Sequence, residues 1–334
     1  MDPRKILKAD KTGIYCIPGK FYIDPMRPAE NAVVTHGHAD HARSGHNKVL
    51  ATKDTIAIMK IRYGENSCGT FQEAAYGERL NLGDVRLSFF PAGHILGSAQ
   101  IEIEYKGYKI IVSGDYKRRY DPSCQAFEVR SCNLFITEAT FALPVFRLPE
   151  PGDEVEKLLK SIERFPNTAH LLGSYSLGKC QRMIMELRRK SFSDKIYLHG
   201  AMLKLCEYYR ETGLDLGELE PVGRLGKAEL KGKLILCPPS ALSDKWSRRM
   251  GESITSMASG WMHIRARAKQ RRAELPIIIS DHADWNELTR TIKEINPEEV
   301  WVTHGREQAL IRWCELEGYQ AKALSLVGYE EENS

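Results

Sequence analysis

The sequence predicts an α/β protein built from two differently organised parts. Short apolar runs separated by turn residues fill the first 140 residues, which is typical of strands. From about residue 150 onward, strand patterns alternate with helical ones, which indicates βαβ units. The composition, 42% hydrophobic and 28% charged over 334 residues, suits a globular chain of one large or two medium domains and excludes a disordered one.

The first part contains one helical pattern among its strands. Ile56, Met59 and Tyr63 share one face of a helix expected over residues 54–63. Gly83-Asp84 and Gly107 mark turns between apolar runs. We expect strands at 14–17, 21–23, 32–35, 48–51, 85–91, 99–105, 108–113 and 134–137.

The second part begins after a proline-rich break at residues 144–152. Asp153 is the expected N-cap of the first helix after this break, because its carboxylate can accept from the first free backbone N–H groups. We expect helices at 153–165, 177–190, 202–209, 285–295 and 307–317. We expect strands at 169–172, 195–198, 233–237, 276–279, 299–303 and 321–326.

Charge and cysteine content exclude some classes of protein. The net charge of +4 is too mild to indicate a nucleic-acid partner by itself. No run of 18 apolar residues predicts a membrane span, and no apolar segment follows the first residues as in a secretory signal. The eight cysteines form no C-x-x-C pair, which favours reduced thiols in a cytoplasmic protein without a membrane partner.

The strongest chemical signal is the motif His36-x-His38-x-Asp40-His41, directly after an apolar run. Residues i and i+2 of an extended chain point to the same side, so His36 and His38 can reach one metal ion together. If the chain then turns into a helix, Asp40 and His41 approach a second position. Imidazole nitrogen and carboxylate oxygen are ligands of zinc and manganese, so the motif predicts a metal site.

Two later residues follow predicted strands and extend this set. His94 comes after the strand at 85–91, and Asp115 follows the apolar strand that ends in Ser113-Gly114. Taken alone, His94 beside glycines fits a structural role equally well, and Asp115 after a glycine is more typical of a turn residue. Their order after the first motif favours additional metal ligands, with Asp115 placed to bridge two ions.

These residues resemble a known family. Asp24, the His36–His41 motif, His94 and Asp115 resemble the first four motifs of the metallo-β-lactamase fold, and Glu138, His282 and His304 resemble motifs A, B and C of its β-CASP branch. The resemblance covers nearly the whole chain and implies an αββα sandwich from residues 1–150 and 274–334. A β-CASP domain, residues 151–273, would be inserted between them. Within the branch, the chain is similar to bacterial ligase-associated DNA exonucleases.

The resemblance also implies a role for each residue. Glu138 would orient a ligand or the attacking water, and Asp24 would brace the metal-binding loop without being a ligand. His282 would protonate the leaving oxygen. The cofactors would be two divalent ions, Zn²⁺ or Mn²⁺, with His36, His38 and His94 on the first, Asp40, His41 and His304 on the second, and Asp115 between them.

A second signal is the segment 173–179, Gly-Ser-Tyr-Ser-Leu-Gly-Lys, between a predicted strand and a predicted helix. Small residues, hydroxyls, a lysine and a helix N-terminus form an anion site, so we expect Ser174, Ser176 and Lys179 to bind a substrate phosphate. The alternative is an ordinary helix cap made by Ser176. Basic runs follow at 182–190, 245–249 and 265–272; each is either a solvated face or a contact to a nucleic-acid backbone.

These observations lead to the hypothesis of an enzyme, a two-metal nuclease that acts on DNA, most simply a 5′→3′ exonuclease in DNA repair. The resemblance implies DNA as substrate and a DNA ligase or helicase as partner. Three alternatives stay open. They are an RNA-processing ribonuclease, which the histidine at position 304 favours, a small-molecule hydrolase of the same fold, and an inactive scaffold that only binds nucleic acid.

Overall fold

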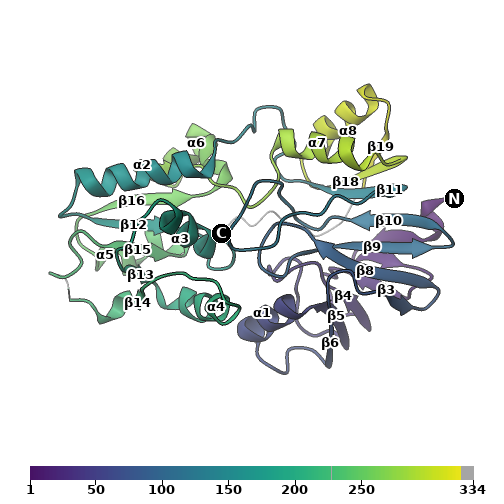
Figure 1. Cartoon of the computed structure of the whole chain (residues 1–334), viewed down its shortest axis with the longest axis horizontal. Helices are drawn as coiled ribbons and strands as arrows, with labels where there is room; N and C mark the ends of the chain where they lie inside the picture. The colour runs from purple at the N-terminus through teal and green to yellow at the C-terminus, as the bar shows by residue number, and fades with distance from the viewer. Residues whose placement is uncertain (227, 325–334) are drawn as a thin grey trace. The chain divides into compact units, whose positions relative to one another are not determined.

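The chain folds into two compact units, which we describe separately. The computed structural model describes residues 1–226 and 228–324 (Figure 1). The first unit consists of residues 1–147 together with the described residues from 282 onward, and the second of residues 148–281. In the described part of the chain, no helix is both long and apolar enough to cross a bilayer.

Two mixed sheets form the first unit. The first sheet has the order β1-β2-β3-β4-β5-β6 and the second the order β19-β18-β11-β10-β9-β8-β7. The strands of the first sheet are β1 (Leu7–Asp10), β2 (Gly13–Cys16), β3 (Phe21–Ile23), β4 (Asn31–Val33), β5 (Lys48–Thr52) and β6 (Thr70–Ala74). Those of the second are β7 (Leu80–Leu82), β8 (Val85–Pro91), β9 (Ala99–Tyr105), β10 (Tyr108–Val112), β11 (Leu134–Ala139), β18 (Glu299–Gly305) and β19 (Gln320–Ala323).

Successive residues of β10 and β11 in the second sheet bury opposite faces, which explains the apolar runs of these two strands. Ile110 and Ile136 lie in the core between the two sheets. Their neighbours Ile111 and Phe135 lie in a second core, beneath α7 (Trp285–Ile295) and α8 (Glu307–Leu316). A side-chain period of two in a strand covered on both faces produces this pattern.

A third core completes the layers of this unit. The helix α1 (Lys53–Tyr63) packs Ile56 and Met59 on the outer face of the first sheet. Thr52 caps this helix through its side chain, and Asp284 and Glu287 form a reciprocal capping box on α7. Helix, sheet, sheet and helix therefore form an αββα sandwich, which confirms the predicted fold class. The short helix η1 (Pro3–Lys5) precedes β1.

The second unit contains a parallel sheet with the order β14-β13-β15-β12-β16-β17. The helix α2 precedes its first strand, and α3 and α4 connect the next strands, as parallel pairing requires. The strands are β12 (Ala169–Gly173), β13 (Ile196–Leu198), β14 (Leu219–Pro221), β15 (Leu234–Cys237), β16 (Ser253–Ala258) and β17 (Leu275–Ile277). The helices are α2 (Pro151–Arg164), α3 (Lys179–Arg189), α4 (Gly200–Glu211), α5 (Lys245–Arg248) and α6 (Arg265–Gln270), with short turns η2 (Val222–Arg224), η3 (Pro239–Ser243) and η4 (Gly260–His263).

Several boundaries differ from those expected. α2 begins at Pro151, so Glu150 occupies the N-cap position and Asp153 lies in the first turn; proline suits this first helical position because it has no N–H to leave unpaired. β17 pairs with β16, so residues 274–281 belong to the second unit rather than to the first. For the last expected strand, 321–326, β19 accounts for residues up to Ala323, and residues 325 and 326 lie outside the described part.

Candidate metal centre

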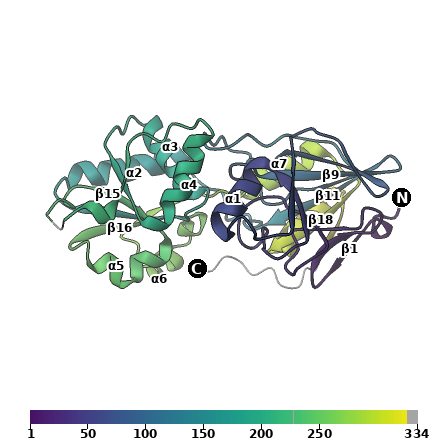
Figure 2. The same cartoon turned by 90° about the horizontal axis from the view of Figure 1, so that it is seen from below.

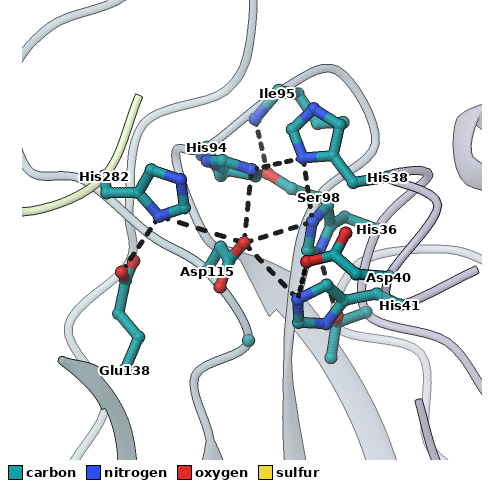
Figure 3. A network of polar contacts seen from close by, with 12 residues as sticks. His36, His38, Asp40, His41, His94, Ile95, Ser98, Asp115, Glu138 and His282 are labelled. Atoms are coloured by element: carbon teal, nitrogen blue, oxygen red, sulfur yellow. Dashed lines mark hydrogen bonds and ion pairs between the residues drawn. The ribbon is translucent and has the colours of Figure 1, made fainter. Parts of the chain in front are cut away.

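The predicted metal ligands of the first unit come together at one place (Figure 3). β8, β10, β11 and β18 run in the same direction, so their carboxyl ends share one edge of the second sheet. His94 and Asp115 follow β8 and β10, while Glu138 and His304 lie near the ends of β11 and β18. The loop after β4 adds the histidine-rich motif to this edge.

The first group of ligands consists of His36, His38, His94 and Asp115. The Nδ1 atom of His38 lies 3.1 Å from Nε2 of His36 and 2.9 Å from Nε2 of His94. Oδ2 of Asp115 lies 3.4 Å from Nε2 of His36 and 3.7 Å from Nε2 of His94. These four ligand atoms lie within 4.8 Å of one another, and their role as ligands of the first metal stays a prediction.

The second group shares Asp115 with the first. A turn after His38, in which the N–H groups of His41 and Ala42 donate to the His38 carbonyl, brings the second half of the motif back to the site. Nε2 of His41 then lies 3.5 Å from Oδ2 of Asp115 and 3.6 Å from Oδ2 of Asp40. Nδ1 of His304 lies 3.9 Å from Oδ1 of Asp115. Asp115 therefore stands between both groups.

The spacing of these atoms fits divalent cations. Metal–nitrogen bonds of about 2.0–2.1 Å in a tetrahedral site put two ligand nitrogens about 3.3 Å apart. The imidazole pairs of the first group, at 2.9 and 3.1 Å, come close to this spacing. Oδ1 of Asp40 is buried and has no hydrogen-bond partner within the described residues. A buried carboxylate oxygen needs a donor or a cation, so the donor set fits two ions.

The electrostatics of the two groups differ. Burial lowers the pKa of His36 and His94 well below the usual histidine range, so both rings stay neutral and keep a lone pair for a cation. Burial also acts to lower the pKa of His41, but the carboxylates of Asp115, Asp40 and Asp24 outweigh it and raise that pKa well above the usual range. The second group is therefore rich in negative charge that a cation would neutralise.

Asp24 contacts the histidine-rich loop at Thr35 and His41, and the bracing role that the resemblance implies for it stays a prediction. Its Oδ1 accepts from the backbone N–H of Thr35 at 2.8 Å, and its Oδ2 accepts from the Thr35 hydroxyl at 2.6 Å. Oδ2 also lies 2.8 Å from Nδ1 of His41. A proton shared at Nδ1 leaves Nε2 of His41 as the nitrogen that faces Asp115 and Asp40.

Backbone strain accompanies these contacts. Asp24 and His304 have φ angles of +43° and +54°, in the left-handed region that costs residues other than glycine about 1–3 kcal/mol. Gly114 has a φ of +55°, and a Cβ built on it would lie 2.8 Å from the Cβ of Thr35. Only glycine allows the loop that carries Asp115 to approach the histidine-rich loop so closely.

His282 and Glu138 form a pair beside the ligands. Nδ1 of His282 lies 3.0 Å from Oε2 of Glu138 and 3.9 Å from Oδ2 of Asp115. The other oxygen of Glu138 accepts from the backbone N–H of Tyr116 at 2.7 Å. The Glu138 side chain is fully buried, whereas that of His282 is 27% exposed. The histidine is thus held at one nitrogen and accessible to solvent, an arrangement suited to a proton donor.

Lys117 supports the site and was not predicted from the sequence. Its buried ammonium donates to the carbonyl oxygen of His94 at 2.5 Å and pairs with Asp121 at 2.8 Å. It therefore fixes the loop after β8 from which His94 projects. The only signal in the sequence is a lysine two residues after a predicted ligand, which does not distinguish it from a solvated lysine.

The loop that carries His282 is held by a second group of contacts. The N–H of Ala283 donates to the Tyr116 carbonyl at 2.6 Å, and Arg119 pairs with Asp284 at 2.7 Å. Asp284 is also the N-cap of α7. The start of this helix therefore determines where His282 lies.

The predicted phosphate-binding residues lie in the second unit. Ser174 and Lys179 are buried, and the Lys179 ammonium donates to the carbonyl of Ile279 at 2.9 Å and pairs with Asp281 at 3.0 Å. Ser176 does not cap α3, because Gly178 is the N-cap and its N–H donates to the side chain of Gln181. Lys179 thus already pairs with the carboxylate of Asp281, and its binding of a phosphate stays a prediction.

Comparisons with known proteins agree with this geometry. A family model described as "Zn-dependent metallo-hydrolase RNA specificity domain" (RMMBL) matches residues 276–323. A solved structure of a protein of unknown function from Enterococcus faecalis V583 has the same fold, with a TM-score of 0.59 at 13% identity over 90% of this chain and 80% of that one.

Proteins with similar sequences are named for different activities. A probable DNA ligase of Opitutus terrae is 27% identical over 90% of this chain and 30% of its own length. Endoribonuclease ysh-1 of Neurospora crassa is 28% identical over 46% of this chain and 22% of its own length, so the chain spans less than a third of either relative. An RNase J-like protein of Methanocaldococcus jannaschii is 22% identical over 85% of this chain and 83% of its own. The layered fold, the ligand set around Asp115 and these relatives thus make the chain similar to the β-CASP metal-dependent nucleases, which have the metallo-β-lactamase fold.

Proposed function

We propose that the chain is a two-metal phosphodiesterase that hydrolyses DNA, as a 5′→3′ exonuclease in DNA repair. The observation that carries the proposal is the position of Asp115, whose carboxylate lies within 4 Å of a histidine nitrogen from each metal group and of His282. A phosphodiester carries a negative charge and a poor leaving group, and this one site offers cation ligands and a proton donor together.

Two divalent ions, zinc or manganese, would neutralise the phosphate and lower the pKa of the attacking water. The protein residues supply the rest of the chemistry. His282, held through Nδ1 by Glu138, would donate its other ring proton to the leaving oxygen. Glu138, whose second oxygen accepts from the Tyr116 N–H, would accept from Nδ1–H of His282 before and after this transfer and so keep the ring in place.

The proposal includes DNA as the substrate and a DNA ligase as a partner. The relative named as a probable DNA ligase matches 90% of this chain with only 30% of its own length. That relative therefore joins a segment similar to this chain to a longer segment of its own, and its name is that of a ligase. Their fusion in one protein supports a nuclease and a ligase that act one after the other. An exonuclease trims ends, and a ligase then joins them.

RNA is the second candidate substrate. It is favoured by the description of the matching family model and by the names of the ribonuclease relatives. His304 at the second metal group fits either polymer, because it would contact a cation and no sugar. A test with matched DNA and RNA strands therefore separates the two candidates.

The test follows product lengths over time from strands labelled at the 5′ or the 3′ end, with Mn²⁺ or Zn²⁺ added. We expect mononucleotides from the 5′ end of DNA, and much slower cleavage of the all-ribose strand. His36→Ala and Asp115→Ala should lose activity by at least about 10³-fold. His170→Asn, a buried histidine of the second unit, is the matched control. Full activity of the Asp115 variant, or cleavage of RNA alone, would contradict the proposal.

A further inference from the structure

One segment of the second unit accounts for the whole net positive charge of the chain. Residues 244–274 contain 8 lysines and arginines and 3 acidic residues, a net charge of 8 − 3 = +5. The complete chain has a net charge of +4, so all the other residues together amount to 4 − 5 = −1. A concentration of charge of this kind indicates a local partner of opposite sign.

Seven of these cations are exposed and are not neutralised by the protein. In the described residues, none of the seven has an acidic oxygen within 4 Å or a side-chain hydrogen bond. They are Lys245, Arg248, Arg249, Arg265, Lys269, Arg271 and Arg272. The eighth, Arg267, is half-buried and lies over the ring of Trp261, 3.8 Å from its centroid. The protein therefore holds a set of arginines and lysines without compensating carboxylates.

Basic residues elsewhere in the second unit behave differently. In the run at 182–190, Arg182 is fully buried against Asp281, and Arg188 donates to backbone carbonyls of Phe192 and Asp194. Arg189 pairs with a glutamate on its own helix. This run serves the fold, so of the three basic runs in the sequence only the two at 245–249 and 265–272 are available to a partner.

The two available runs lie on one side of the same sheet. Figure 2 shows α5 and α6 on the side of β15 and β16 opposite to α3 and α4. Leu242, in the turn before α5, packs into the apolar clusters under both runs. Trp246 and Met262 anchor the two segments in these clusters. Apolar contacts thus fix the helices while the cations stay in solvent; we call these seven exposed cations with Arg267 the α5–α6 face.

We propose that the α5–α6 face binds the sugar–phosphate backbone of the nucleic-acid substrate at nucleotides other than those that react. This inference rests on the proposed function for the identity of the polyanion. Arginine and lysine neutralise phosphates without reading bases, so the contact is independent of sequence and of sugar type. It extends the substrate site beyond the metal centre and makes affinity depend on strand length.

The test compares two variants that change the net charge equally. The face variant is Arg248→Gln/Arg249→Gln/Arg271→Gln/Arg272→Gln. The control variant, Arg189→Gln/Lys195→Gln/Arg290→Gln/Lys322→Gln, removes four cations that are paired with glutamates. Binding of fluorescein-labelled dT and rU 30-mers is followed by anisotropy from 50 to 500 mM NaCl, with EDTA present to prevent cleavage.

We expect the face variant to bind both strands on the order of 100-fold more weakly near 0.15 M salt, with a salt slope smaller by about 0.7 per lost phosphate contact. The control variant should bind like the parent. Equal loss in both variants, no loss in either, or no binding by the parent would overturn the proposal.

A second readout separates this inference from the proposed function. Hydrolysis of bis(p-nitrophenyl) phosphate needs the metal centre, and this ester has no further nucleotides for the α5–α6 face to bind, so the face variant should keep the parent rate. If the parent hydrolysed neither this ester nor a long strand, the proposed function would fail while the binding result still decided the role of the face.

Discussion

Replacement of Asp24 by asparagine should weaken metal binding without removing any metal ligand. The carboxylate accepts three hydrogen bonds, from the Thr35 N–H, the Thr35 hydroxyl and His41 Nδ1, at 2.8, 2.6 and 2.8 Å. Asparagine has nearly the same shape but only one acceptor oxygen. Whichever way the amide is turned, one of its sides presents a donor where an acceptor is needed.

The magnitude follows from the two orientations of the amide. With its oxygen toward His41, the NH₂ group faces the Thr35 N–H, and two buried donors oppose each other. With its oxygen toward the Thr35 N–H, the NH₂ group faces Nδ1 of His41 and moves that proton to Nε2, the nitrogen that faces Asp115. Loss of one bond to a charged acceptor costs about 1.5–3 kcal/mol, which corresponds to roughly 10- to 100-fold in affinity.

The assay is a competition titration of zinc between the protein and a chromogenic chelator. We expect the Asp24→Asn variant to bind at least one ion about 10- to 100-fold more weakly, and to regain nuclease activity at high metal concentration. Asp10→Asn is the matched control, since Asp10 accepts from the Thr12 N–H and the Tyr22 hydroxyl in the same unit but contacts no metal ligand. Unchanged affinity, or an activity loss that metal does not restore, would show that Asp24 has another role.

Three further predictions concern single side chains. Lys117→Met should lower the free energy of unfolding, measured with denaturant, by about 3–5 kcal/mol, because the buried Asp121 then loses the Lys117 ammonium. The double variant Lys117→Met/Asp121→Leu should recover part of this loss. Equal stability of Lys117→Met and the parent would contradict the pairing. Glu138→Gln should slow cleavage of DNA by about 10- to 100-fold. It should slow hydrolysis of bis(p-nitrophenyl) phosphate less, because nitrophenolate leaves without a proton from His282. Equal slowing of both reactions would argue against a proton donor held by Glu138. Burial lowers the pKa of His170, so the unfolded chain binds this proton at higher pH than the folded chain and stability falls as the pH drops below the usual histidine range. Between pH 7 and pH 5, His170→Asn should therefore lose less stability than the parent, by up to about 1.4 kcal/mol per pH unit; parallel stability curves would show that His170 does not titrate in this range.

The metal centre could be predicted because its chemistry is local in the sequence. Four predicted ligands lie within six residues, and the i, i+2 spacing of His36 and His38 predicts that both can reach one ion. The roles of Glu138, His282 and His304 came from resemblance, since nothing in their neighbours indicates that they meet across more than 140 residues. In the structure, His282 lies 3.0 Å from Glu138 and His304 lies 3.9 Å from Asp115, so all these residues meet at one site.

Contacts between distant residues account for what could not be predicted. Lys179 has the sequence context of an anion site, but the anion it meets is Asp281, about a hundred residues later. β16 was not predicted because its residues are largely small and polar, yet it lies between β12 and β17 and is held by hydrogen bonds from both sides. The start of a helix depends on single hydrogen bonds, such as the one that the Gly178 N–H donates to the Gln181 side chain. The sequence offers nearby hydroxyls as equally good caps, so the capping residue could not be predicted.

The order of the ligands along the chain has a consequence for biosynthesis. His36, His38, His94 and Asp115 all precede the second unit, whereas His282 and His304 follow it, and β18 pairs with β11 across that interval. A ribosome therefore releases a nearly complete first ion site long before the other can form. The four ligands of the first group are thus synthesised before the second unit, whereas His282 and His304 can join them only after the second unit has been made and β18 has paired with β11.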